Sequence, residues 1–158
     1  MVDRFLPARI DNAYRGRKFA LWLFGLVVAV KILQSLMVIL SGHYILREAD
    51  GIPLDTYSAA AEQTVVAVWA LLGLTRLIIY ALCVLVLVRY RGAIPLMFAV
   101  LALHYLASQL LLRFVPLVTT GSPPGPVVNL CLFAVMIVGL ALSLWGQGPR
   151  SGSPARAT

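Results

Sequence analysis

The chain has 158 residues, of which 61% are hydrophobic and only 12% are charged, and its net charge is +7. A soluble domain carries roughly 25% charged residues, so this composition excludes an ordinary soluble domain and indicates a protein whose solvent is lipid. The basic charge follows from orientation in a membrane, and we expect no nucleic-acid partner.

Four segments are long and apolar enough to cross a bilayer, which takes ~20 residues of helix. In chain order they cover residues 19–41, 63–88, 93–112 and 127–145. Their continuous apolar runs favour helices over barrel strands, which alternate. We therefore expect an all-α membrane protein, a four-transmembrane-helix bundle formed by one domain at 19–145. A basic segment at 1–18 precedes the bundle, and a disordered tail at 146–158 follows it.

Basic residues are distributed unevenly between the two ends of these spans. Nine lie on one side, in the N-terminal segment, the second connection and the tail: Arg4, Arg9, Arg15, Arg17, Lys18, Arg89, Arg91, Arg150 and Arg156. The connections on the other side hold only Arg47 and Arg113. Positive loops stay in the cytoplasm, so the pattern predicts a multi-pass protein with both termini cytoplasmic, the N-in/C-in orientation.

The three connections differ in character. The first, at 42–62, has a turn signal at Asp50-Gly51, and its acids Glu48, Asp50 and Asp55 are interpreted as an exposed acidic loop. The second, at 89–92, is tight and predicts that spans two and three form an antiparallel pair. The third, rich in glycine and proline at 121–126, is expected to be irregular and to stop the helix on both sides.

Three basic side chains fall at one depth inside the spans. Lys31 is 13 residues past Lys18, Arg76 is 13 before Arg89, and His104 is 13 past Arg91. Each therefore lies ~20 Å from its edge charge, which predicts a layer near the middle of the membrane. A lysine or arginine facing lipid at that depth costs ~2.5–3.5 kcal/mol, so these side chains should face the interior of the bundle.

Steps of three and four residues place further polar or small side chains on the same helix faces. On span two they join Trp69, Gly73, Arg76, Tyr80 and Cys83, and on span three they join Met97, Leu101, His104, Ser108 and Leu111. On span four they join Asn129, Met136 and Ser143, with Gly139 and Ser143 as a close-packing pair. The set predicted to face the interior is Lys31, Gln34, Arg76, Tyr80, His104 and Ser108.

This layer carries positive charge with no acid inside any span. Four resolutions are open: a neutral Lys31, a hydrated cavity, an anionic ligand or lipid headgroup, or an acid from another subunit. A plain alternative is a polar network with water that only stabilises the bundle. For His104 the corresponding alternative is a hydrogen-bonded interior histidine.

Motifs for chemistry are largely missing. The chain has no Cys-x-x-Cys, no His-Glu-x-x-His, no phosphate-binding glycine loop and no nucleophile elbow. His43 and His104 differ in depth by ~18 Å, too far to be paired haem ligands. Cys83 and Cys131 are interpreted as small buried residues at different depths, without a disulfide. No catalytic residue, metal site or cofactor is predicted, and a bound lipid or quinone is left open.

The layout resembles that of small four-helix proteins of bacterial inner membranes, a group without an assigned activity. The similar features are Lys31 in span one, Arg76 in span two, the basic turn Arg89-Tyr90-Arg91 and the arrangement of residues 77–145. The resemblance implies the fold and a bacterial inner-membrane location, and it implies no chemistry.

Three hypotheses for function follow. The first is a non-catalytic accessory or scaffold subunit of a larger inner-membrane complex, in which a partner acid or lipid headgroup neutralises the basic layer. The second is a binding or transport protein, acting as a homo-oligomer, for an anion, an anionic lipid or a quinone-like molecule. The third is a membrane enzyme that uses His104 and Tyr80 as acid and base. The expected partners are membrane lipid and another membrane protein or a second copy.

Overall fold

The structure is a computed structural model, and it describes residues 14 and 16–145. Most of the predicted basic segment at 1–18 and the whole predicted tail at 146–158 lie outside the described residues.

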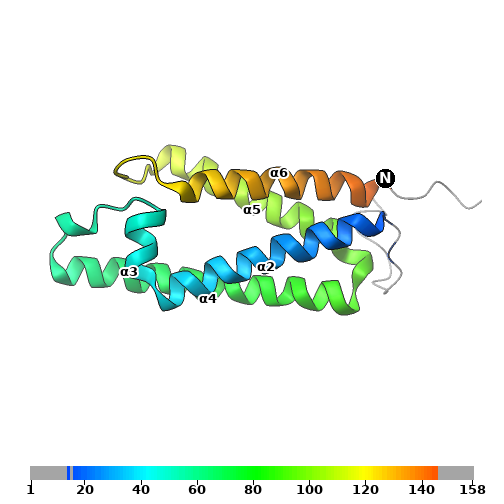
Figure 1. Cartoon of the computed structure of the whole chain (residues 1–158), viewed down its shortest axis with the longest axis horizontal. Coiled ribbons are helices and arrows are strands. Elements are labelled where there is room, and N and C mark those ends of the chain that lie inside the picture. Colours follow the sequence, from blue (N-terminus) through cyan, green and yellow to red (C-terminus); the bar gives the residue numbers. More distant parts are fainter. Residues whose placement is uncertain (1–13, 15, 146–158) are drawn as a thin grey trace, which may run out of the picture.

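Within the described part of the chain, four helices are long and apolar enough to cross a membrane, and there is no strand. They are α2 (Lys18–Leu40), α4 (Ala59–Arg89), α5 (Ile94–Phe114) and α6 (Pro124–Leu144). Figure 1 shows them running lengthwise through an elongated molecule. The prediction of an all-helical, multi-pass membrane protein is confirmed at this level.

The helix ends follow local signals. α4 begins four residues before the predicted span, because the Ser58 hydroxyl caps it by accepting a hydrogen bond from the Ala61 N–H at 3.4 Å. A short 3-10 turn, η3 (Arg91–Ala93), leads into α5. The prediction that residues 121–126 stop the helix on both sides is wrong for the last three. α6 begins at Pro124, since the first turn of a helix needs no N–H donor.

The helices do not form a closed ring. α2 packs along α4 on one side and against α6 on the other, and α6 in turn carries α5. α4 and α5 have little contact with each other, although the tight turn at η3 joins them. The prediction that spans two and three form an antiparallel pair is therefore wrong as packing, because α4 packs mainly against α2 and α5 packs mainly against α6.

The two ends of the bundle are unlike. At one end, called here the turn end, α2 begins, α6 ends and η3 connects α4 to α5 (Figure 1). At the other, the loop end, α3 (Gly42–Tyr44), the π-helical turn η1 (Ile45–Ala49) and the 3-10 turn η2 (Leu54–Thr56) connect α2 to α4. Residues 115–123 connect α5 to α6 at this same end.

The first connection is folded onto the bundle. Leu46, Ile52 and Leu54 are buried and form a small apolar core with Val65, Val66 and Trp69 of α4. Gly51 has a φ of +69°, a conformation that favours glycine, and its carbonyl accepts a hydrogen bond of 2.7 Å from the Thr120 N–H. The two connections at the loop end are thus joined.

The main core lies toward the turn end. Its buried residues come from all four long helices: Phe24, Val27, Val28, Tyr80, Cys83, Ile94, Phe98, Leu101 and Met136. The rings of Phe24 and Phe98 meet edge to face, with centroids 4.9 Å apart. Gly139 of α6 lies directly against the Phe98 ring, so a side chain there would overlap it. This contact is what lets α5 and α6 approach closely.

On three of the spans, the buried helix face is the one that the residue spacing predicted. Gly73, Tyr80 and Cys83 are buried on α4, Ser35 is buried on α2, and Met136, Gly139 and Ser143 are buried on α6.

Three residues depart from the predicted burial, and the first is His104, which was expected to face the interior but is exposed on α5. The span-three stripe is buried at Leu101, but Leu111 farther along is 62% exposed, because the last turns of α5 lie apart from α4. The interpretation of both cysteines as buried is wrong for Cys131, which is exposed on α6, whereas Cys83 is buried. Both are free thiols, as predicted.

Candidate functional site

A cavity of about 610 Å³ occupies the loop-end half of the bundle. All four long helices line it, and Tyr80, Leu101 and Met136 of the main core close it toward the turn end. Its volume is within the range of small-molecule pockets, roughly 300–1,000 Å³. Because α4 and α5 scarcely touch, contact between these helices does not close the cavity along their side.

The six side chains selected from the sequence all line this cavity. Two come from each of three helices: Lys31 and Gln34 from α2, Arg76 and Tyr80 from α4, and His104 and Ser108 from α5. The wall also holds polar residues that were not in that set, namely Asp50, Trp69, Tyr105, Gln109 and Asn129. Helical spacing predicted which side chains of these three helices line the cavity, and α6 adds the side-chain amide of Asn129.

Lys31 has one partner in the cavity. Its ammonium Nζ donates a hydrogen bond of 2.6 Å to the Asn129 side-chain oxygen Oδ1, which joins α2 to α6. An ammonium has three donors, and within the described residues Lys31 uses only this one. The contact fixes the position of the ammonium and leaves it able to bind a second acceptor.

Arg76 has no partner of this kind. It is half-buried on the wall of the cavity, and among the described residues its guanidinium makes neither a hydrogen bond nor an ion pair. A guanidinium carries five N–H donors in a planar fork that matches carboxylate and phosphate oxygens. Intramembrane basic residues normally pair with an acid or a carbonyl, so this unpaired arginine marks the site.

Lys31 and its partner Asn129 lie on the loop-end side of their helices. Asn129, which contacts Lys31, is five residues into α6, ~8 Å from the loop end of that helix. Lys31 is nine residues from the end of α2, ~14 Å along its axis. Lys31 and its partner are therefore within reach of groups that enter from the loop end.

One acid approaches this layer, which the sequence interpretation missed. Glu48 and Asp55 are exposed as expected, but Asp50 is half-buried and lines the cavity. Burial raises the pKa of Asp50, while the positive charge of Arg76 acts in the opposite direction. The interpretation of Asp50 as part of an exposed loop is wrong, because η1 turns the chain back over the cavity.

Gly125 makes this return possible. A Cβ atom at Gly125 would lie 2.7 Å from the Ala49 carbonyl oxygen and 2.8 Å from the Asp50 carboxylate oxygen Oδ1. Only a residue without a side chain lets α6 begin directly beside η1. A glycine between two prolines in the first turn of the fourth helix was the one sequence signal that could have indicated this close contact.

The remaining polar side chains leave hydrogen-bonding capacity in the cavity. The Ser108 hydroxyl donates to the His104 carbonyl at 2.8 Å, one turn back on α5. Gln34, His104 and Gln109 make no side-chain hydrogen bond within the described residues. Apolar side chains complete the wall toward the loop end, among them Met37, Val38, Leu112, Leu117 and Val128. The cavity thus has the charged groups of Lys31 and Arg76 at one level and an apolar lining toward the loop end.

The arrangement gives little support to catalysis. Tyr80 and His104 share the cavity, but no hydrogen bond joins their side chains in the described structure. Acid–base partners are recognised by such contacts or by a nearby nucleophile. Among the described residues, no cluster of three or more histidine, cysteine or acidic side chains is arranged to hold a metal ion.

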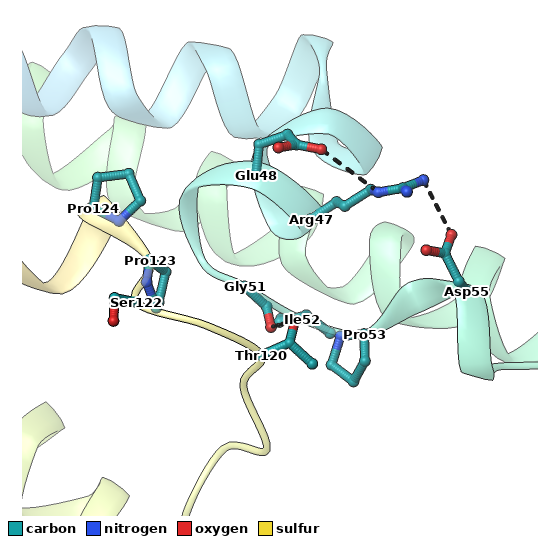
Figure 2. A pocket seen from close by; sticks show the side chains of 10 residues that line it. All are labelled: Arg47, Glu48, Gly51, Ile52, Pro53, Asp55, Thr120, Ser122, Pro123 and Pro124. Atoms are coloured by element: carbon teal, nitrogen blue, oxygen red, sulfur yellow. Dashed lines mark hydrogen bonds and ion pairs between the residues drawn. The ribbon is translucent and has the colours of Figure 1, made fainter.

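A second cavity, of about 390 Å³, lies on the surface of the loop end (Figure 2). Arg47 is held there between Glu48 at 3.5 Å and Asp55 at 3.0 Å, and all three side chains are about half exposed or more. Exposed ion pairs of this kind contribute little, and the single cation is already shared by two acids. We therefore take the larger cavity as the candidate site.

The structure defines an all-helical protein whose four long apolar helices indicate a multi-pass membrane protein, with an internal cavity that holds charged groups in a largely apolar lining. No protein-family model, curated protein or solved structure matches the chain.

Proposed function

We propose that this protein is a binding protein for an anionic amphiphile, a membrane lipid or lipid-like molecule whose anionic headgroup enters the cavity and contacts Arg76 and Lys31. The observation that carries the proposal is the Arg76 guanidinium, which faces a cavity without a hydrogen-bonding partner among the described residues. A phosphate or carboxylate would satisfy its donors in a bidentate manner.

The apolar wall favours an amphiphile over a simple inorganic anion. Within the basic layer, Lys31 lies ~14 Å from the loop end of α2, and its partner Asn129 lies ~8 Å from the loop end of α6. Apolar side chains line the space between this layer and the loop end. The separation of α4 and α5 gives an acyl chain a place to lie against the bilayer while its headgroup is inside.

Orientation and location belong to the same proposal. The excess of basic residues in the N-terminal segment, the second connection and the tail supports cytoplasmic termini, and the loop end would then face the outer side of a bacterial inner membrane. The ligand would then come from the outer leaflet. The charge of Arg76 also disfavours a neutral quinone as the ligand, because a quinone carbonyl would leave that charge unbalanced.

The accessory-subunit hypothesis is the second candidate. The observation in its favour is the gap between α4 and α5, which a helix from a partner or a second copy of the chain could fill. The argument that a partner must supply an acid is weaker than the sequence suggested, because Asp50 of this chain lines the cavity. The hypothesis therefore ranks below ligand binding.

Trp69 provides a direct test because it lines the cavity and is one of only three tryptophans. Replacing Trp22 and Trp145 by phenylalanine leaves Trp69 as the sole indole. The protein is placed in phosphatidylcholine bilayers, and its fluorescence is measured as brominated phosphatidylglycerol replaces part of the lipid. Brominated phosphatidylcholine is the parallel series, since bromine quenches an indole that it contacts.

We expect brominated phosphatidylglycerol to quench Trp69 at lower mole fraction than brominated phosphatidylcholine. Arg76→Gln should remove this preference. Arg113→Gln is the matched control, because Arg113 is exposed at the same end of the bundle and does not line the cavity. The proposal is contradicted if the two brominated lipids quench Trp69 equally in the protein that keeps Arg76. It is also contradicted if Arg76→Gln and Arg113→Gln lose the preference for phosphatidylglycerol to the same extent.

A further inference from the structure

Asp50 is the only acid among the described residues that lines the cavity. It follows η1, and its carboxylate lies beside the first turn of α6, close to Gly125. Within the described residues this carboxylate forms no ion pair and accepts no hydrogen bond. Its neighbour in sequence, Arg47, is already paired with Glu48 and Asp55 on the opposite side of the connection.

The charged and titratable groups around Asp50 can be named element by element. α2 contributes Lys31, α4 contributes Arg76 and Tyr80, and α5 contributes His104 and Tyr105. α6 and the connection at 115–123 contribute no charged side chain. Arg76 is the group whose charge acts on Asp50, although the two are not in direct contact.

We propose that Asp50 is the resident counterion of the cavity and that the ligand anion takes over its role beside Arg76, so that anion binding is coupled to protonation of Asp50. The inference rests on the proposed function, since it concerns the same site. In the empty protein the ionised carboxylate partly balances Arg76. When the anionic headgroup enters beside Arg76, it brings a second negative charge close to the carboxylate, and the carboxylate takes up a proton from water.

The coupling has a definite sign. Above its pKa, Asp50 is ionised and competes with the headgroup for the field of Arg76, so the anion binds weakly. Below that pKa, Asp50 is neutral and the anion binds tightly. Burial raises the pKa of Asp50, which moves this change toward mildly acidic pH. Anion affinity should therefore rise as the pH falls.

The experiment compares the sole-Trp69 protein with its Asp50→Asn variant, using the same quenching by brominated phosphatidylglycerol between about pH 5 and pH 7. The phosphodiester headgroup keeps its charge throughout this range. Both proteins contain the same His104, so the contribution of this side chain cancels in the comparison. Brominated phosphatidylcholine corrects at each pH for changes in the indole itself.

We expect the parent protein to bind phosphatidylglycerol about tenfold more tightly at the acidic limit, the size of a moderate interaction between unit charges. Asp50→Asn should bind tightly already at neutral pH and lose most of the pH dependence. Asp50→Glu, which restores a carboxylate, should restore the dependence. Asp55→Asn is the matched control, because Asp55 is exposed and paired with Arg47, and it should behave like the parent.

The two proposals fail in different ways. If the parent and Asp50→Asn both prefer the anionic lipid, with the same affinity and the same pH profile, Asp50 is no counterion and the inference is overturned while the site stands. If neither protein prefers the anionic lipid at any pH, the proposed function itself fails, and the inference fails with it.

Discussion

The two halves of the bundle are built for different purposes. The turn-end half has a continuous apolar core, in which Phe24 meets Phe98 and Gly139 admits the Phe98 ring. The loop-end half has separated helices, a cavity and a half-buried arginine without a hydrogen-bonding partner in the described structure.

The difference shows how a small membrane protein can tolerate a site whose charge is unbalanced. Packing in one half supplies the stability that the charged cavity in the other half lowers, as is common where function needs a strained or polar site. Substitutions in the turn-end half should therefore change stability, and substitutions around the cavity should change binding. The predictions below test this division.

Gly139→Ala should have the largest effect on stability. The new methyl group would overlap the Phe98 ring, and overpacking a core costs typically about 1–3 kcal/mol. We expect the free energy of unfolding, measured in detergent micelles, to fall by about 3 kcal/mol.

Gly25→Ala is the control for this substitution. It is also a glycine in a spanning helix, but its nearest neighbour, Leu87 Cδ2, is 3.5 Å from the Cβ position, an ordinary contact. It should be neutral or slightly stabilising, since alanine is the better helix former. Equal destabilisation by both substitutions would show that helix propensity, and not the Phe98 contact, governs this half.

Arg76→Met should act in the opposite direction. Removing an unpaired cation from the membrane interior removes a cost of about 2–3 kcal/mol, so the ligand-free variant should be more stable than the parent, by about 2 kcal/mol. Thermal unfolding in neutral detergent measures this. A clear loss of stability would favour the alternative in which Arg76 belongs to a hydrated polar network that supports the bundle.

Asn129→Leu should have a smaller, destabilising effect. It removes the acceptor of the 2.6 Å hydrogen bond from Lys31, and a charged hydrogen bond contributes about 1.5–3 kcal/mol in soluble proteins and less between membrane helices. We expect a loss of about 1 kcal/mol.

Gln109→Leu is the comparison for Asn129→Leu. Gln109 also lines the cavity, but its side chain makes no hydrogen bond within the described residues. This substitution should leave the free energy of unfolding unchanged or raise it. If both substitutions had the same effect, the contact between Lys31 and Asn129 would carry no net stability.

Local patterns in the sequence predicted much of the fold. Hydropathy located the four helices because a bilayer imposes length and composition on each span separately. Steps of three and four residues predicted the buried face of α4, and they also gathered the six polar side chains that line the cavity. These features depend on one helix at a time.

Features that depend on how helices and connections meet were not predicted. The separation of α4 from α5 follows from their different neighbours, because α4 packs against α2 and α5 packs against α6. The return of Asp50 depends on η1 and on the contact with Gly125, neither of which has a periodic signal. The hydrogen bond between Lys31 and Asn129 joins two helices, so residue spacing along either helix could not indicate it.

Native mass spectrometry of the gently extracted protein tests the central claim most directly, that the cavity at Arg76 binds an anionic amphiphile. The parent protein should retain one anionic lipid-sized mass, Arg76→Met should lose it, and Arg113→Met should keep it. The claim is contradicted if the parent and Arg76→Met carry the same bound masses, or if the parent arrives without such a mass and in fixed stoichiometry with another membrane protein.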